Sequence, residues 1–400
     1  MTQLVLTRKP ILADLGRWLG ADTEGTVVVT SAGPDRPDGP DGGAERRFLH
    51  VHRFEDYSAP DAGARIVELA RRFAATRIAS LNEVDVLRAA AARQLLGLPG
   101  QDIAGAVAFR DKYVMKSLVS AAGVPVAPMR RVPCAPRGAI AAGRLRYPLV
   151  VKPIAGGGSV GVQVLTDPRQ WEGVTTPGPL LVEEMVDEAS FYIVDGLMKH
   201  GRATLPVPLQ MGSGNFTYAT GDQPVAGYSL PRDGGLFTEL TVFCDEVLRI
   251  LPPVTEETAF HMEIFRDRAG RLLLCEVACR PGGMGHPSTF RTVTGVDLNE
   301  ASLLGQLGRP RPGTGDERLQ EGGFAGFPRR DGVLVRHPDR LTHPHVMSYT
   351  ALVAAGEYTT RSRWVGDDAA QLTLKAPAGM AMGDVMAEVV AEYRSLTEWA

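Results

Sequence analysis

The stretch AFHMEIFRDRAGRLLLCEVACRPGG, residues 259–283, holds two apolar segments on either side of a polar turn. Residues 267–270 form a turn signal, so the flanking segments are predicted to pair as antiparallel strands. We take Arg266 to lie opposite Arg271. Glu263 and Glu276 then share one face of the hairpin as diagonal neighbours, roughly 7 to 8 Å apart at Cα. Their carboxylates are expected to converge.

Two converging carboxylates repel each other unless one is protonated or a cation lies between them. Mg²⁺ takes one or two protein carboxylates and completes its shell with water and phosphate oxygens, so Glu263 and Glu276 suit a magnesium nucleotide. Zinc would require more His or Cys than His261 offers. The alternative is a pair of glutamates on a solvated sheet face, because a turn shifted by one residue would place them on opposite faces.

Arg280 follows the second predicted strand inside the segment RPGG. A guanidinium fork suits a carboxylate, a phosphate or the oxyanion of a tetrahedral intermediate. The alternative is an arginine that pairs with a nearby glutamate. Beyond it, Gly283 and His286 are candidate substrate contacts. His286 could also transfer a proton, or simply cap the following helix.

Upstream, LVVKPIAGGGSVGVQVL at residues 149–165 contains the spacing G-x-G-x-x-G. The spacing alone is weak, because the chain has 45 glycines in 400 residues. Strand-like segments flank it on both sides, whereas a dinucleotide fingerprint needs a helix after the glycines. A glycine hairpin of this kind can close its backbone N–H groups over phosphates. Protein kinases use the same device, but their downstream H-R-D and D-F-G motifs are absent. The alternative is a flexible hairpin tip without a ligand.

Between these stretches and the N-terminus, RDKYVMKSLVSAAGVPVAP is predicted to form one helix that ends near Gly123. Lys112 lies at its start, where the helix dipole disfavours a cation unless an anion is nearby. The alternative is a solvated surface lysine. Residues 212–235 are rich in glycine and predict a mobile loop that could cover a site. The first hundred residues alternate apolar runs with helical segments, which is typical of a small open α/β layer.

The composition excludes some classes of partner. A formal net charge of −3 provides no field for binding nucleic acid. No run of about 18 apolar residues predicts a membrane span, and no signal peptide is recognised at the N-terminus. We therefore expect a cytoplasmic protein that acts on small molecules. Its cysteines are expected to be reduced, mostly buried thiols, namely Cys134, Cys244, Cys275 and Cys279.

Taken in order, these motifs resemble the ATP-grasp superfamily, and within it the carboxylate–amine (L-amino acid) ligases. The resemblance covers residues 97–308 and rests on LGLPG, RDK, VVKP, the glycine hairpin, VEEMV, HMEI, EVACRPGGMGH and TGVDL. It implies an α/β (α+β) ATP-grasp fold in three parts. These are an N-terminal open α/β pre-ATP-grasp domain (1–105), a two-lobed ATP-grasp domain with the nucleotide between its lobes (106–315), and a β-rich C-terminal closing domain (316–400).

The resemblance also implies cofactors and residue roles. ATP and Mg²⁺ are the expected cofactors, with Mn²⁺ as an alternative ion. Lys112 and Lys152 would contact the nucleotide phosphates. Glu263 and Glu276 would bind magnesium, and Arg280 would stabilise the developing anion during catalysis. The remaining nucleotide contacts are expected at Gly156, Gly157, Gly158, Ser159, Gly161, Glu183, Glu184, Met185, Val186 and Glu188, with Glu183 accepting from the adenine amino group and Glu188 contacting the ribose.

One position departs from the family pattern. Many relatives carry Asn two residues after the second metal-binding glutamate, whereas this chain has Ala278. The implied activity is ATP-dependent formation of an amide or peptide bond between a small-molecule carboxylate and an amine, through an acyl phosphate. A role in natural-product biosynthesis and a homodimer are compatible with the resemblance. The alternatives are an ATP-grasp carboxylase or purine-pathway-type synthetase, and a nucleotide-binding protein without turnover, for which Ala278 is the support.

Overall fold

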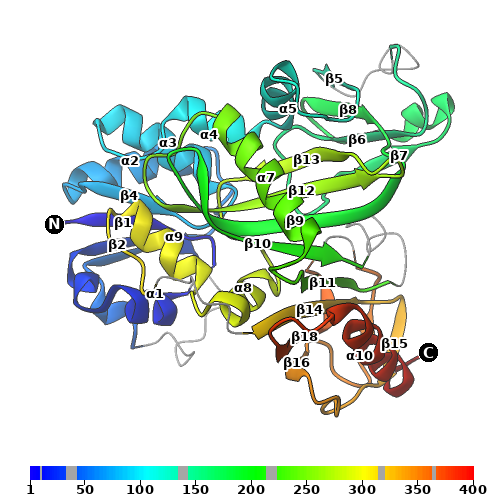
Figure 1. Cartoon of the computed structure of the whole chain (residues 1–400). Helices are drawn as coiled ribbons and strands as arrows, with labels where there is room; N and C mark the ends of the chain where they lie inside the picture. Colours follow the sequence, from blue (N-terminus) through cyan, green and yellow to red (C-terminus); the bar gives the residue numbers. More distant parts are fainter. Residues whose placement is uncertain (10, 33–42, 134–142, 213–222, 314–319, 363–365) are drawn as a thin grey trace.

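A computed structural model describes residues 1–9, 11–32, 43–133, 143–212, 223–313, 320–362 and 366–400 of the chain. The mixed α/β fold confirms the predicted class. Figure 1 shows the parallel N-terminal sheet at the left, a long antiparallel sheet through the middle, and a small antiparallel sheet at the upper right. None of the helices in these described ranges is long and apolar enough to cross a membrane.

The N-terminal layer is a four-stranded parallel sheet with the order β3-β2-β1-β4, as the alternating apolar and helical segments predict. Strands β1, β2 and β4 are largely buried on both faces, as is typical of parallel sheets, whereas the edge strand β3 is half-buried. The elements of this part are β1 (Gln3–Leu6), α1 (Leu12–Leu19), β2 (Thr26–Ser31), β3 (His50–Phe54), α2 (Ala62–Arg72), β4 (Arg77–Ser80), α3 (Asp85–Leu96) and α4 (Ile103–Arg110).

Asp85 carries a titratable carboxylate inside this N-terminal layer. It is fully buried at the start of α3, where the hydroxyl of Tyr57 donates to its Oδ2 at 2.9 Å. Burial raises the pKa of Asp85 to about 6, from an ordinary value of 3.8. The native state therefore binds this proton more tightly than the unfolded chain does. This group's contribution to stability is present below pH 4 and is lost as the pH rises through 6.

We expect Asp85→Asn to raise the free energy of unfolding at pH 7.5 by about 1 to 3 kcal/mol, because the amide carries no buried charge and can still accept from Tyr57. At pH 4 the variant and the wild type should be equally stable. Urea denaturation at both pH values measures this, with the exposed Asp61→Asn as the control. A variant that is less stable at pH 7.5 would show that the helix N-terminus holds the anion favourably.

The small antiparallel sheet has the order β5-β8-β6-β7 and carries the glycine hairpin. Leu149 pairs with Leu165 and Val151 with Gln163, which confirms the predicted hairpin. The predicted helix that starts at the RDK segment and ends near Gly123 is confirmed as α5, with Gly123 in a left-handed conformation just beyond its end. The elements are α5 (Lys112–Ala121), β5 (Met129–Val132), β6 (Leu149–Pro153), β7 (Gln163–Leu165) and β8 (Leu180–Glu184).

The long sheet has eight strands in the order β13-β12-β9-β10-β11-β14-β18-β16. Alternate residues of β9 point to its two faces. Tyr192 and Val194 pack under α7, while Phe191 and Ile193 pack under α8 and α9. The elements are β9 (Glu188–Lys199), β10 (Arg202–Met211), β11 (Val225–Ser229), α7 (Gly235–Ile250), β12 (Thr258–Asp267), β13 (Leu272–Ala278), α8 (His286–Thr294) and α9 (Leu298–Gln306).

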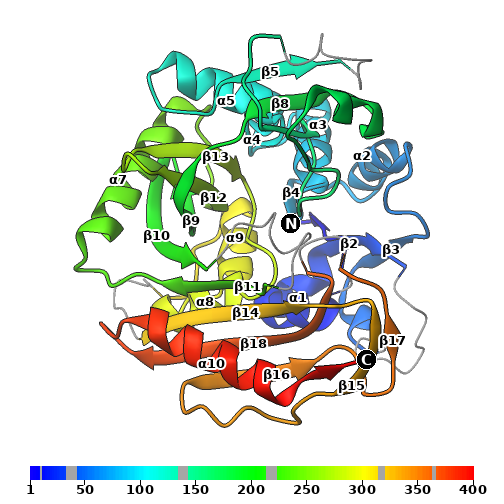
Figure 2. The same ribbon diagram turned by 90° about the vertical axis from the view of Figure 1, so that its right-hand side faces the viewer.

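Strands β14, β18 and β16 of the C-terminal part continue the long sheet, whereas β17, β15 and β19 form a small separate sheet. β14 pairs with β11 and β18, and α10 covers them, as Figure 2 shows at the lower edge. The sheet therefore runs across the predicted boundary at residue 315, and the domain limits stay a prediction. The elements are β14 (Gln320–Pro328), β15 (Gly332–Arg336), β16 (Val346–Ala351), β17 (Tyr358–Thr359), β18 (Asp368–Pro377), α10 (Met382–Leu396) and β19 (Glu398–Trp399).

The prediction of a loop over residues 212–235 is wrong in part. Residues 225–229 form β11, which pairs with β10 on one side and β14 on the other, and α7 begins at Gly235. Gly227 lies in this strand and contributed to the loop prediction. It allows close packing of the sheet, because a Cβ on Gly227 would lie 2.7 Å from Sδ of Met211. Residues 213–222 lie outside the described residues, as does Cys134. The other cysteines are free and buried, as predicted.

Candidate active site

A cleft of about 1300 Å³ lies between the small sheet and the face of the long sheet that also packs on α8 and α9. It brings together almost all the residues singled out from the sequence. Those that line it are Lys112, Lys152, Gly156, Gly157, Gly158, Ser159, Glu183, Glu184, Met185, Val186, Glu188, Glu263, Glu276, Arg280, Gly283 and His286.

Gly161 is the exception among these predicted residues. It does not line the cleft, and its φ of +75° places it in the left-handed region. A Cβ there would lie 3.2 Å from Cγ of Pro153. Gly161 therefore shapes the turn of the hairpin, and the cofactor contact predicted for it finds no support. Gly158 and Ser159, also left-handed, lie at the tip that faces the cleft.

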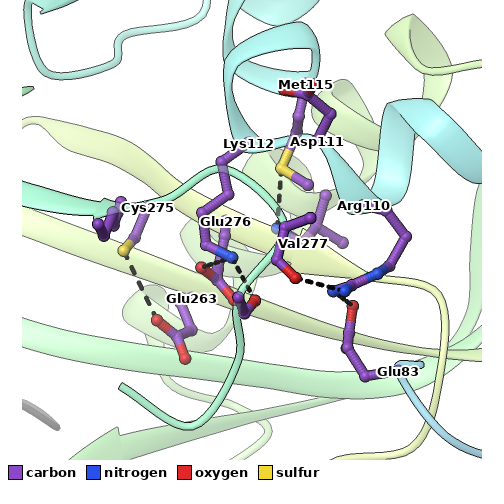
Figure 3. Close-up of polar contacts among 12 residues, drawn as sticks. Glu83, Arg110, Asp111, Lys112, Met115, Glu263, Cys275, Glu276 and Val277 are labelled. Atoms are coloured by element: carbon purple, nitrogen blue, oxygen red, sulfur yellow. Dashed lines mark hydrogen bonds and ion pairs between the residues drawn. The ribbon is translucent and has the colours of Figure 1, made fainter. Parts of the chain in front are cut away.

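The predicted register of the β12–β13 hairpin is wrong by one residue. Arg266 pairs with Leu272, and Ile264 with Leu274. A β-bulge at Cys275 then shifts the pairing, so Glu263 lies directly opposite Glu276 and not diagonal to it. The bulge restores the outcome that the sequence predicted, because it returns both glutamates to one face. Figure 3 shows the two side chains together, with Cys275 Sγ 3.5 Å from Oε2 of Glu263.

The two glutamates have different electrostatic surroundings. Burial and the neighbouring Glu276 raise the pKa of Glu263 to about 7. Burial also acts on Glu276, but the ammonium groups of Lys112 and Lys152 outweigh it and lower its pKa to about 2. Burial and mutual repulsion thus oppose ionisation of both carboxylates at once, and a cation between them would relieve that repulsion. A divalent cation fits this donor set.

Glu263 and Glu276 would hold Mg²⁺ through their carboxylate oxygens. Ala278 lies two residues along β13 from Glu276, so by strand alternation it faces the same side, and its methyl group offers no oxygen. Any further ligands at that point must come from water or phosphate, which is how Mg²⁺ is commonly bound.

The surroundings of Lys112 explain why a lysine can begin helix α5. The N-cap Asp111 accepts from the backbone N–H groups of Tyr113 and Val114. Lys112 itself is buried and lies 3.0 Å from Oε2 of Glu276, while its ammonium also donates to the carbonyl of Gly156 at 2.8 Å. The predicted anion is therefore present (Figure 3). Lys112 links α5, the glycine hairpin and the paired glutamates.

A second buried cluster surrounds Glu183 on β8. Its Oε1 pairs with Lys152 and its Oε2 with Lys116, and all three side chains are nearly inaccessible. Burial opposes ionisation, but the two lysines lower the pKa of Glu183. Glu183 thus contacts Lys152, which lines the cleft, and Lys116, which does not. The sequence did not single out Lys116, although it lies one helical turn after Lys112.

We expect Glu183→Gln to lower the free energy of unfolding by about 3 to 5 kcal/mol in the absence of nucleotide, because both ammonium groups would lose their counter-charge inside the protein. Lys116→Met should lower the free energy of unfolding by less, because it leaves Glu183 and Lys152 as a neutral pair. Urea denaturation compares the two, with the exposed Glu172→Gln as the control. A larger loss for Lys116→Met would mean that the lysine stem, and not the charge balance, stabilises this region.

The other residues of the VEEMV segment make mixed contacts. Glu184 turns toward Arg146, which donates from Nη2 to Oε2 at 3.0 Å. The backbone N–H of Met185 donates to the carbonyl of Pro148 at 2.9 Å, so a nucleotide contact at this residue would use its carbonyl oxygen or its side chain. Val186 and Glu188 also line the cleft.

Arg280 pairs with a glutamate that the sequence did not single out. Its Nε donates to Oε2 of Glu83 at 2.5 Å, and its Nη1 to the carbonyl of Pro281 at 2.8 Å. Glu83 follows β4 of the N-terminal sheet and also pairs with Arg110 (Figure 3). Burial opposes its ionisation, but Arg280 and Arg110 lower the pKa of Glu83. The N-terminal layer thus positions an arginine that follows β13 of the long sheet.

His286 and Gly283 lie at the same end of the cleft. His286 is the first residue of α8 and is buried against Asp195 and His261. A Cβ on Gly283 would meet no atom within 4 Å, so this position is open toward the cleft. Neither Asp195, within β9, nor Glu83, just after β4, could have been found from local motifs, because each reaches its partners only through folding.

Comparison with known proteins bears on the fold and on the chemistry. No family model matches the chain. An L-arginine-specific L-amino acid ligase of Bacillus subtilis is 25% identical over 273 residues, which are 64% of this chain and 64% of the relative. The chain thus spans less than two thirds of that relative's length.

Solved structures align over the whole chain. An L-amino acid ligase from Bacillus licheniformis superposes with a TM-score of 0.76 at 16% identity, covering 100% of this chain and 99% of that one. The chain has the ATP-grasp fold. A biotin carboxylase domain of Hydrogenobacter thermophilus 2-oxoglutarate carboxylase, solved as a dimer with MgADP, ADP and bicarbonate, superposes at 0.64 with 16% identity, covering 100% and 91%. Within this ATP-grasp fold, the cleft lies between the small sheet, which carries Lys152, and the long sheet, which carries the paired glutamates.

Proposed function

We propose that the protein is an ATP-dependent carboxylate–amine ligase that forms an amide or peptide bond through an acyl phosphate, with an amino acid or an amino-acid-derived acid as the carboxylate. The observation that carries this proposal is the pairing of Glu263 opposite Glu276, with Lys112 bridging them to the glycine hairpin. The proposal is supported by the similarity of the chain to two proteins named as L-amino acid ligases.

The residues of the cleft divide the work. Lys112 and Lys152 place positive charge where the triphosphate would lie, and the hairpin tip at Gly157 to Ser159 would cover it. Mg²⁺, held by Glu263 and Glu276, would supply charge neutralisation for the phosphoryl oxygens. Glu183 would keep Lys152 in place, and its contact with the adenine amino group belongs to the same proposal, as does the ribose contact of Glu188.

The proposed chemistry has two steps. A carboxylate oxygen attacks the γ-phosphorus, the bond to the β,γ-bridging oxygen breaks, and ADP leaves. The amine nitrogen then attacks the acyl carbon, and phosphate leaves with one of the original carboxylate oxygens. Arg280, held by Glu83, would stabilise the tetrahedral oxyanion between these events. The closed hairpin would exclude water, which otherwise hydrolyses the acyl phosphate.

A mixture of the standard amino acids labelled with ¹⁸O in their carboxylates tests this. Incubation with ATP and Mg²⁺ should release ADP and yield condensed products, and mass spectrometry should find one ¹⁸O in each phosphate released. ADP release without ¹⁸O transfer would contradict the proposal. ADP release that depends on bicarbonate would favour a carboxylase-type reaction, which the structural similarity to a biotin carboxylase domain supports as the second candidate. Nucleotide binding without any ADP release would favour the non-catalytic alternative.

Three further points belong to this proposal. Mn²⁺ is expected to replace Mg²⁺, because both prefer oxygen ligands. A homodimer is proposed because one structural neighbour is described as a dimer. A cytoplasmic location is proposed because ATP is the expected phosphoryl donor.

A further inference from the structure

A buried triad of Asp195, His261 and His286 lies at one end of the cleft, and the proposed chemistry above does not use it. Asp195 is on β9, His261 lies opposite it on β12, and His286 begins α8. Nδ1 of His261 lies 2.7 Å from Oδ1 of Asp195, and Nδ1 of His286 lies 2.6 Å from its Oδ2. Each imidazole thus uses a separate carboxylate oxygen.

The backbone of the RPGG segment closes over this triad. A Cβ on Gly282 would lie 2.7 Å from Cβ of His286 and 2.8 Å from Oδ1 of Asp195. Only glycine fits there without displacing the triad. The same segment begins with Arg280, so the triad and the proposed oxyanion contact are held by one short stretch of chain.

Hydrogen bonds explain the spacing of the triad better than a shared metal does. Two ligands bound at about 2.0 to 2.1 Å to a tetrahedral zinc ion would lie about 3.3 Å apart. The two N to O distances, 2.6 and 2.7 Å, are shorter and typical of charge-assisted hydrogen bonds. Burial opposes ionisation of Asp195, yet the two imidazoles hold the pKa of Asp195 well below its usual range.

An ionised Asp195 can only accept, so both Nδ1 atoms carry the proton that they donate. In the neutral imidazoles, each Nε2 is then an acceptor. Both rings line the cleft, whereas Asp195 does not. Nε2 of His261 lies 3.9 Å from Oε1 of Glu263, so this ring is directed at the paired glutamates. His286 packs on Phe324 with its ring centroid 4.5 Å away. Its hydrogen bond to the described residues uses Nδ1, and Nε2 has no hydrogen-bond partner among them.

The proposed reaction needs an acceptor of this kind. An amine enters at neutral pH as an ammonium ion, which has no lone pair for attack on the acyl carbon. Resting on the proposed ligase function, we propose that His286 accepts this proton at Nε2 and that Asp195 is the positioning residue that fixes the ring, with His261 holding Asp195 from the other side. The neutral amine then forms the C–N bond as the C–O bond to phosphate breaks, and the second nitrogen proton leaves with the phosphate.

The surroundings of His286 suit this transfer. Outside the triad, the charged and titratable groups that face it are Glu263, whose Oε1 lies 3.9 Å from Nε2 of His261, and the Arg280 guanidinium, which acts on both Asp195 and His261. When His286 becomes an imidazolium, it forms a neutral pair with the Asp195 carboxylate. The proton is therefore accepted without leaving an unpaired charge in the buried triad.

His286→Asn tests the inference, because its amide can still donate to Asp195 from the position of Nδ1 but offers no acceptor at the position of Nε2. Each reaction contains ATP, Mg²⁺, the mixture of standard amino acids and hydroxylamine, which is uncharged at neutral pH and attacks without prior deprotonation. Condensed products should fall by about 10² to 10⁴-fold, whereas amino-acid hydroxamates should stay within about 10-fold of the wild-type amount. Asp195→Asn should likewise lower the ratio of condensed products to hydroxamates.

The outcomes are distinguishable by mass spectrometry of both product classes. Equal loss of condensed products and hydroxamates in His286→Asn, with MgADP still raising its melting temperature, would give His286 a structural role and overturn the inference. Unchanged formation of condensed products would overturn it as well. If the wild type forms neither product class, the ligase proposal itself fails, and the inference fails with it.

Discussion

Replacing Glu276 by Gln is expected to lower ADP release by about 10³-fold, equivalent to roughly 4 kcal/mol of lost stabilisation. Glu276 is the more acidic member of the pair and stays ionised throughout the neutral range, so the substitution removes a full charge. It also leaves Lys112 without its carboxylate partner, although Lys112 keeps its bond to Gly156. Steady-state ADP release and calorimetric binding of MgADP measure the effect.

The control for this experiment is Glu68→Gln on α2, an exposed glutamate paired with Arg65 and remote from the cleft. It should leave both ADP release and MgADP binding unchanged. In Glu276→Gln, MgADP binding should weaken while ADP binding without Mg²⁺ stays nearly constant. Wild-type turnover in this variant, or an equal loss of binding with and without Mg²⁺, would remove Glu276 from the metal site.

The sequence predicted the pairing of Glu263 with Glu276 for a reason that proved incomplete. The two glutamates share a face because Cys275 forms a bulge, and the predicted register was off by one. Alternation along the strands fixes which residues can face the same side, but a bulge depends on packing around the whole hairpin. Cys275 contributes to the core beneath α8 and α9, which local sequence does not reveal.

Short motifs predicted the parts of the site that lie within one stretch of chain. Lys112, Lys152 and the glycine hairpin are of this kind. Glu83 and Asp195 are different, because each is an isolated acid whose partners come from distant strands and helices. Their role depends on how the N-terminal sheet meets the long sheet, and on which residue of β9 faces β12. No spacing rule in a single sequence encodes those contacts.

Replacing Arg280 by Met is expected to separate the two proposed steps. The contacts of Arg280 engage Nε and Nη1, so among the described residues Nη2 is the nitrogen left to face a substrate. Loss of one hydrogen-bond donor to an oxyanion typically lowers the catalytic rate by about 10² to 10³-fold. Formation of condensed product should fall by that amount. ADP release should fall less, because phosphoryl transfer does not require the tetrahedral oxyanion and water can hydrolyse the acyl phosphate that accumulates.

Glu83→Gln is the matched variant, because it keeps the arginine and removes the charge that holds it. We expect condensed product to fall by about 10-fold, between the wild type and Arg280→Met, with the ratio of ADP to product raised in the same direction. The ratio of ADP to condensed product decides between the two roles of Arg280. If Arg280→Met lowers ADP and product equally, the arginine acts before the acyl phosphate forms, and its assignment to the tetrahedral oxyanion is wrong. If Glu83→Gln alone lowers both equally, Glu83 supports the junction of the two sheets and does not position Arg280.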